Sequence, residues 1–324
     1  MKTVRTYSPK TKILSLILSF LIIFYLIPSS VFAEGLDNDT TVSDSSVSEN
    51  EENSTYTPEI YEVTELREEN VKHFRLEDGS YVAAQYNYPV HYTDENGQLI
   101  DIDNRLTESG SELSTGNSRI KFVKKITGNG NIFTLHENNT KITMGLAGAE
   151  KKTEGIAINN NNSDDAIEST IGKMVNLENI SSTILYEDIL DGVDIEYIVH
   201  SLNIKENIIV KEKKDSYSYT FTIELNNLTA ALADDGNVYI SSLDGVRQYI
   251  IPAPIVYDAN GIYAPDSVAE YSLSTTGNGK YVLIVTVNTA WMNDGTRAVL
   301  TVTINTYFPL PVVDKLYSAT LSGA

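Results

Sequence analysis

The sequence predicts an all-β protein, an antiparallel β-sandwich that follows a signal peptide and a disordered acidic linker. The first observation is an alternation of apolar and polar side chains every two residues, clearest in residues 217–225 (YSYTFTIEL). Such alternation is typical of a strand with one buried and one solvated face. The second observation is a series of turn dipeptides: Asp78-Gly79, Asn129-Gly130, Asp191-Gly192, Asp235-Gly236, Asn260-Gly261 and Asn278-Gly279. Short strands punctuated in this way indicate a sandwich or a barrel.

One hairpin can be placed by its turn. Asp94-Glu95-Asn96-Gly97 separates the strand candidates 88–92 and 99–103, and Asn-Gly favours a tight turn because both residues tolerate positive φ. The other strand candidates are residues 81–86, 120–126, 132–135, 141–144, 184–186, 193–199, 204–211, 217–225, 238–240, 248–251, 254–257, 269–273, 281–287 and 298–304. The stretches 78–97 and 235–261 share the order Asp-Gly, strand, Pro-x-x-Tyr, Asn-Gly. An internal duplication or convergent turn chemistry explains this echo equally well.

The first 33 residues have the layout of a secretory signal peptide. Four basic residues precede the apolar run 13–27 (ILSLILSFLIIFYLI), and Val31-Phe32-Ala33 places small residues before a cleavage point after Ala33. The alternative is a membrane anchor. A run of 15 residues would rise about 22 Å as a helix, whereas the hydrocarbon core of a bilayer is about 30 Å thick. We therefore expect a secreted or extracellular protein that meets a membrane only through the uncleaved signal peptide.

The rest of the chain divides by composition. Residues 34–58 are poor in apolar side chains and rich in acidic residues, Ser and Thr, which predicts a disordered linker. Residues 59–70 are ambiguous, because the three-residue spacing of Ile60, Val63 and Leu66 also fits a short amphipathic helix. The β-sandwich region is expected over residues 59–308. The Asn-rich stretch 147–173 interrupts the strand pattern and would either divide two packed β units or form a long surface loop, and residues 309–324 are a tail.

The net charge limits the classes of partner, and the cysteine content limits how the core can be stabilised. The chain has 24 Lys and Arg residues against 44 Asp and Glu residues, a formal charge of −20, and no cysteine. The leader holds four of the basic residues and no acidic one, so removing it leaves 20 basic against 44 acidic residues, or −24. This charge disfavours binding to nucleic acid and to anionic lipid. The core must be stable without disulfides, which a chain of this length can achieve by burial.

No catalytic set emerges from the residue pattern. There is no cysteine nucleophile and no Gly-x-Ser-x-Gly elbow. The four histidines, His73, His91, His136 and His200, each lie on or beside an expected strand, where a pairing role is commoner than catalysis. We therefore assign no catalytic residue and no cofactor-binding residue, and we predict that the protein is not an enzyme.

The sequence gives equally weak evidence for a metal-binding site. The candidates for calcium are acidic turns: Asp94-Glu95-Asn96 with Asp101 and Asp103, then Asp188, Asp191 and Asp194, and finally Asp164-Asp165. Calcium requires six to eight converging oxygen ligands, and none of these segments matches an EF-hand loop. Solvated turn carboxylates are the simpler interpretation, so no metal ligand is assigned and no cofactor is expected.

A family resemblance rests on the order of several short motifs. They are residues 67–81 (REENVKHFRLEDGSY), 88–104 (YPVHYTDENGQLIDIDN), 185–210 with Gly192-Val193-Asp194-Ile195-Glu196-Tyr197, 251–258 (IPAPIVYD) and 291–297 (WMNDGTR). Together they resemble the N-terminal region of secreted Gram-positive wall-associated proteins of the RHS/YD-repeat type, including those with DNRLRE domains. The resemblance covers roughly residues 60 to 308.

The resemblance implies a β-rich leader module of the cell surface or cell wall, without known catalysis. Residues up to Ala324 hold no YD repeat, DNRLRE segment or Leu-Pro-x-Thr-Gly sorting signal, so we expect a fragment or an isolated leader. The predicted function is a non-catalytic structural or interaction module whose partners are cell-wall components or a C-terminal RHS/YD-repeat region, and not nucleic acid. The alternatives are a carbohydrate-binding or carbohydrate-acting sandwich, favoured by 20 tyrosines, and a calcium-stabilised adhesin.

Overall fold

A computed structural model gives the fold of residues 60–94, 96–128, 130–149, 153–159, 177, 179–294 and 302–308. The expected signal peptide (1–33), the linker (34–58), the tail (309–324) and Asp164-Asp165 lie outside these residues. All strand pairs between named strands in the described part of the chain are antiparallel, and the helices are single short turns: η1 (Thr64–Leu66), η2 (Asp266–Val268) and α3 (Thr289–Met292). The predicted all-β class is confirmed.

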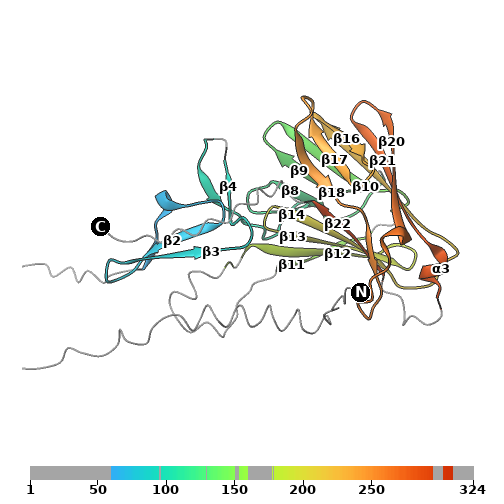
Figure 1. Ribbon diagram of the computed structural model, residues 1–324, viewed down its shortest axis with the longest axis horizontal. Helices are drawn as coiled ribbons and strands as arrows, with labels where there is room; N and C mark the ends of the chain where they lie inside the picture. Colours follow the sequence, from blue (N-terminus) through green and yellow to red (C-terminus); the bar gives the residue numbers. More distant parts are fainter. Residues whose placement is uncertain are drawn as a thin grey trace, which may run out of the picture. The chain divides into compact units, whose positions relative to one another are not determined.

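Two large sheets form the sandwich (Figure 1). The eight-stranded sheet has the order β20 (Ala269–Gly277), β21 (Lys280–Val287), β15 (Tyr217–Asn226), β10 (Thr140–Leu146), β9 (Asn131–Glu137), β8 (Ile120–Val123), β7 (Glu112–Ser114), β6 (Thr107–Ser109). The six-stranded sheet has the order β11 (Gly155–Asn159), β12 (Ser181–Leu190), β13 (Val193–His200), β14 (Asn203–Val210), β22 (Val302–Phe308), β19 (Ile255–Tyr257).

The described residues also form three smaller sheets. One has the order β16 (Leu228–Leu232), β17 (Val238–Ser242), β18 (Arg247–Ile251), and a second has the order β1 (Tyr61–Glu62), β2 (Val71–Arg75), β3 (Tyr81–Gln85). The third is the hairpin of β4 (His91–Thr93) and β5 (Leu99–Asp101), which forms about the predicted Asn-Gly turn with Gly97 at a φ of 78°. The segment that also fitted an amphipathic helix holds β1 and η1 instead.

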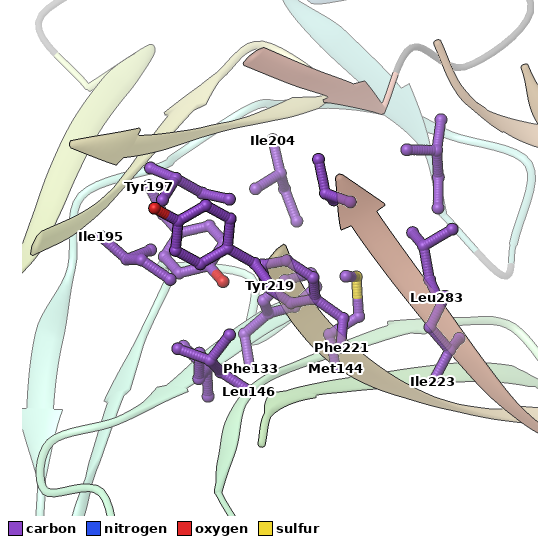
Figure 2. Close-up of a cluster of buried hydrophobic side chains, with 14 of the residues drawn as sticks. Phe133, Met144, Leu146, Ile195, Tyr197, Ile204, Tyr219, Phe221, Ile223 and Leu283 are labelled. Atoms are coloured by element: carbon purple, nitrogen blue, oxygen red, sulfur yellow. The ribbon is translucent and has the colours of Figure 1, made fainter. Parts of the chain in front are cut away.

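The core lies between the two large sheets and is rich in aromatic rings (Figure 2). Phe122 and Phe133 come from the eight-stranded sheet, and Tyr197 comes from the six-stranded one. The Tyr197 ring centroid lies 5.6 Å from that of Phe122 and 5.3 Å from that of Phe133. Aromatic pairs in this range are stabilising beyond the area that they bury. The predicted alternation in β15 is confirmed, because its odd-numbered residues from 217 to 225 are all buried.

The segment between β5 and β6 attaches to the sandwich through Asn104. The Asn104 side-chain amide donates to the carbonyl oxygens of Ile180 (2.8 Å) and Ser201 (2.7 Å). In return, the Ser182 hydroxyl donates to the Asn104 carbonyl oxygen at 2.6 Å. The Ser201 hydroxyl also donates to the carbonyl oxygen of Pro89 at 2.6 Å. These contacts tie the chain on both sides of the β4–β5 hairpin to β12 and to the β13–β14 turn.

Candidate functional site

Five charged or titratable side chains from separate elements meet beside the β4–β5 hairpin. They are Glu62 of β1, Arg67 after η1, Lys72 of β2, His91 of β4 and Asp101 of β5, and we call them the His91 cluster. Strand register brings them together. His91 pairs directly with Asp101 across the hairpin, and Glu62 pairs with Phe74, which places it diagonal to Lys72. Side chains at such positions share one face of a sheet.

Ion pairs connect the two carboxylates of the cluster to the two cations. Arg67 donates from Nε to Glu62 Oε1 at 2.6 Å and from Nη2 to Asp101 Oδ2 at 2.7 Å, and its Nη1 donates to the Leu99 carbonyl oxygen at 3.0 Å. Lys72 Nζ lies 3.2 Å from Glu62 Oε2 and also donates to Asp101 Oδ1. The two positive and two negative charges balance within the cluster.

Most of the cluster is shielded from solvent. The His91 side chain is fully buried, those of Lys72 and Arg67 are 11% and 12% exposed, and that of Asp101 is 48% exposed. Burial opposes ionisation of Glu62, but the hydrogen bond from Arg67 and the charge of Lys72 outweigh it and lower the Glu62 pKa. The Asp101 pKa is lowered in the same way. Burial raises it, and the hydrogen bond from Lys72 is the strongest effect in the opposite direction. Both carboxylates are therefore ionised at neutral pH.

His91 is neutral and has a defined tautomer. Burial lowers its pKa, and the nearby charges of Lys72 and Arg67 lower it further against a hydrogen bond to the Glu68 backbone. The His91 Nδ1 atom lies 2.6 Å from the Glu68 carbonyl oxygen. A carbonyl only accepts, so Nδ1 carries the proton and Nε2 carries a lone pair. That lone pair lies 3.7 Å from Glu62 Oε1 and 3.5 Å from Asp101 Oδ1.

The other sequence candidates are dispersed. Asp94 Oδ1 accepts from the amides of Asn96 and Gln98, so this carboxylate closes its own turn and does not join Asp101. Asp188 and Asp194 do converge, but on Lys211 Nζ, which lies 2.6 Å from each of them. Their hydrogen bonds raise the pKa of the Lys211 ammonium.

The remaining histidines are separated from one another. His73 Nε2 lies 3.6 Å from Glu68 Oε1. The His200 ring packs edge-on against Tyr88, with ring centroids 4.5 Å apart. His136 lines an open groove of about 300 Å³ formed by Tyr92, Thr93, Asp94, Asn117, Ser118, Arg119, His136, Glu137 and Asn138. In this groove Arg119 Nη2 pairs with Glu137 Oε2 at 3.1 Å.

Sequence reasoning missed three members of the cluster. Glu62, Arg67 and Lys72 lie in or next to the ambiguous segment 59–70, and the hairpin residues that complete the cluster, His91 and Asp101, are distant along the chain. His91 and Asp101 were considered only separately, as a pairing histidine and a turn carboxylate. The signal that could have joined them is the register of the predicted hairpin, which sets His91 opposite Asp101.

The fold and the cluster define an antiparallel β-sandwich protein with a buried ion-pair network. The chain is similar to wall-associated proteins. It is 26% identical over 245 residues to the tRNA nuclease WapA of Bacillus subtilis (strain 168), a match that covers 73% of this chain and 10% of the relative. It is 27% identical over 246 residues to the tRNA(Glu)-specific nuclease WapA of Bacillus subtilis subsp. natto, with the same coverage.

A further relative is named for its location. The chain is 23% identical over 208 residues to the Wall-associated protein of Geobacillus stearothermophilus, covering 61% of this chain and 75% of the relative. No family model matches the chain, and no solved structure matches it. The chain spans about a tenth of the length of the nucleases that it matches. None of the helices in the described residues is long and apolar enough to cross a membrane.

These relatives correct the function predicted from the sequence. The expectation of a non-catalytic module, with its carbohydrate-binding and calcium-adhesin alternatives, and the prediction that the protein is not an enzyme are both wrong, because relatives are named as tRNA nucleases. The reasoning failed because it read the absence of a recognisable catalytic motif in one chain as an absence of activity. The similarity to wall-associated proteins agrees with the resemblance noted above at its coarser level.

Proposed function

We propose that this chain is the wall-associating part of an exported nuclease that acts on tRNA. One observation carries the proposal. The chain matches two kinds of relatives, and matches that cover 73% and 61% of one chain must overlap. The one match covers 75% of a protein named only for its wall association, and the other covers a tenth of a protein named as a nuclease.

The tRNA substrate is proposed for the whole protein and not for the His91 cluster. His91 is fully buried, so its Nε2 lone pair is out of reach of a phosphodiester. The formal charge of −20 also opposes contact with RNA, whose affinity for proteins depends largely on neutralising phosphates with Lys and Arg. Both observations favour the wall rather than RNA as the partner of the described residues.

The finer assignments follow from the sequence. Residues 1–33 direct export, residues 34–58 link the sandwich to the leader, and residues 59–308 form the wall-associating region ahead of the tail 309–324. The motif order over residues 60–308 supports a protein of the RHS/YD-repeat type, and we propose cell-wall components and a repeat region of that kind as its further partners.

Export and wall association are tested by fractionation. A Gram-positive host producing the chain with its own leader is separated into medium, wall and protoplast fractions, and the N-terminus of the exported protein is sequenced. We expect wall-bound protein that begins at Glu34. A Leu18→Arg variant, which puts a charge into the apolar run, should stay in the protoplasts. Exported native protein found in the medium alone would contradict wall association.

The nuclease activity requires a separate assay. The complete exported protein is incubated with total tRNA, and the products are resolved by gel electrophoresis and sequenced. We expect discrete cleavage of one or a few tRNA species. Intact tRNA after incubation with the complete protein would contradict the nuclease assignment, and it would leave the outcome of the fractionation unaffected.

A further inference from the structure

We propose that Glu62, His91 and Asp101 form a zinc-binding site in which the ion competes with the Lys72 ammonium for the two carboxylates. Each of the three residues offers one ligand atom, and these atoms all lie within 4.8 Å of one another. The three ligands come from β1, β4 and β5, so the site requires the folded chain. Neither the relatives' names nor the sequence motifs assign such a site.

His91 is prepared as a ligand. Its Nδ1–H group donates to the Glu68 carbonyl oxygen, which leaves the Nε2 lone pair directed toward the carboxylates. Metal-binding histidines usually donate the N–H of their second ring nitrogen to a carbonyl or carboxylate in this way, and the bond fixes the tautomer and the ring orientation. The His91 side chain is fully buried, so the packing around it fixes the ring before any ion binds.

The position of Nε2 is unfavourable unless a cation shares it. Among the described residues, Nε2 of His91 has no hydrogen-bond partner. Its lone pair instead faces carboxylate oxygens at 3.5 and 3.7 Å, and a buried acceptor without a donor costs free energy. A cation between the three ligand atoms would bind the lone pair and both carboxylates at once. This orphaned nitrogen is independent of the carboxylate spacing and indicates the same position.

The ligand chemistry selects the class of metal. One imidazole and two carboxylates suit zinc and its transition-metal neighbours, whereas calcium and magnesium prefer sets made only of oxygen ligands. Three protein ligands leave a fourth tetrahedral position for water. Asp101, whose side chain is 48% exposed, provides the route from solvent.

Charge balance identifies Lys72 as the competitor. The cluster is already neutral, so a divalent ion added to it would leave an excess charge of +2 in a largely buried place. Lys72 Nζ bridges the same carboxylates that would bind the ion. The lysine has a flexible stem and can move away, whereas Arg67 is also held by the Leu99 carbonyl oxygen. Zinc therefore binds in exchange for the Lys72 ammonium, and this exchange weakens its affinity.

The test is a calorimetric zinc titration of the full chain without an affinity tag. We expect one zinc ion per native chain and no binding of magnesium. Asp101→Asn should weaken zinc binding about tenfold or more, because even changes in the groups that orient metal ligands cost 10–100-fold. His91→Gln should do the same. Lys72→Met keeps the apolar stem and removes the competitor, so it should bind zinc about tenfold tighter or more, because a positive charge close to the ion no longer opposes it.

Asp94→Asn is the matched control. Asp94 lies on the same hairpin, but its carboxylate bonds only to its own turn, so this variant should bind zinc as the native chain does. Circular dichroism before each titration shows whether a variant is folded. If His91→Gln does not fold, Asp101→Asn still tests the site. Failure of the native chain to bind zinc overturns the proposal. Native-like affinity in both Asp101→Asn and Lys72→Met also overturns it, and the cluster is then an ion-pair network only.

Discussion

The attachment of the β5–β6 segment to the sandwich can be tested at Asn104. Its side chain is buried, with 2% of the residue exposed, and it donates to two carbonyl oxygens. In an Asn104→Ala variant the Ile180 carbonyl keeps the amide of Ser201 as a donor at 3.0 Å, whereas the Ser201 carbonyl loses the amide of Asn104. The variant also leaves a space where the amide was.

The magnitude follows from these losses. Two net hydrogen bonds contribute about 1 kcal/mol each, and a buried carbonyl left without its donor adds about 1–3 kcal/mol, partly counted already in the first figure. We therefore expect the free energy of unfolding to fall by about 2–4 kcal/mol. Since small domains are stable by about 5–15 kcal/mol, this loss is a large fraction of the total.

Urea denaturation followed by circular dichroism measures this loss. The midpoint should decrease with an unchanged slope if only the native state is affected. Asn260→Ala is the control, because the Asn260 side chain is exposed and only its backbone amide bonds to Asp258, so its effect should stay within about 0.5 kcal/mol. A similarly small effect of Asn104→Ala would refute the reasoning that this side chain anchors the segment.

Three further predictions concern the core, pH and turns. Phe133→Ala removes a ring packed against Tyr197 and should cost about 3–5 kcal/mol in urea denaturation; a loss below about 1 kcal/mol would contradict the two-sheet core. Burial lowers the pKa of His200 below its usual 6.5, so the unfolded chain takes up the proton first and stability falls as the pH drops below that value. His200→Gln should therefore lose less stability than the native chain between about pH 7 and about pH 5, and equal losses would count against this role. Gly279→Ala should destabilise more than Gly97→Ala, because both glycines have positive φ but only at Gly279 would a Cβ overlap the Leu225 carbonyl oxygen; thermal melts of equal midpoint would show that backbone crowding is unimportant there.

Strands with strong alternation could be predicted from the sequence, and strands without it could not. The buried face of β15 follows from five apolar residues at every second position. By contrast, β6 reads Thr-Glu-Ser and is exposed along its length, and β11 lies within the Asn-rich interruption at 147–173. Edge strands bury little surface and are held by backbone hydrogen bonds, which carry almost no sequence signal.

The His91 cluster shows the same limit for a site. The pairing of His91 with Asp101 could have been predicted from the sequence, because the turn of their hairpin was predicted correctly. Glu62 and Lys72 could not be added, since their approach depends on the pairing of β1 with β2 and on how that sheet packs beside the hairpin. The segment was ambiguous because three apolar residues at three-residue spacing also fitted a short helix, and the backbone of residues 61–62 pairs with β2.

The turn echo between residues 78–97 and 235–261 is also present in the structure. Asp94 and Asp258 each accept hydrogen bonds from the amides two and four residues later, and Gly97 and Gly261 each donate to the carbonyl oxygen of their aspartate. Local turn chemistry accounts for this likeness, because each aspartate closes its own loop. The two segments differ in their strand pairing, since β4 and β5 pair with each other, whereas β19 joins the six-stranded sheet.

Wall association is the central claim, and a sedimentation assay measures it most directly. The purified chain without residues 1–33 is mixed with purified cell walls, and the bound fraction is measured against protein concentration at low and high salt. We predict saturable binding that does not weaken as salt rises, because a chain with 20 basic and 44 acidic residues gains nothing from attraction to an anionic wall. Protein that stays in the supernatant at every salt concentration would contradict the account.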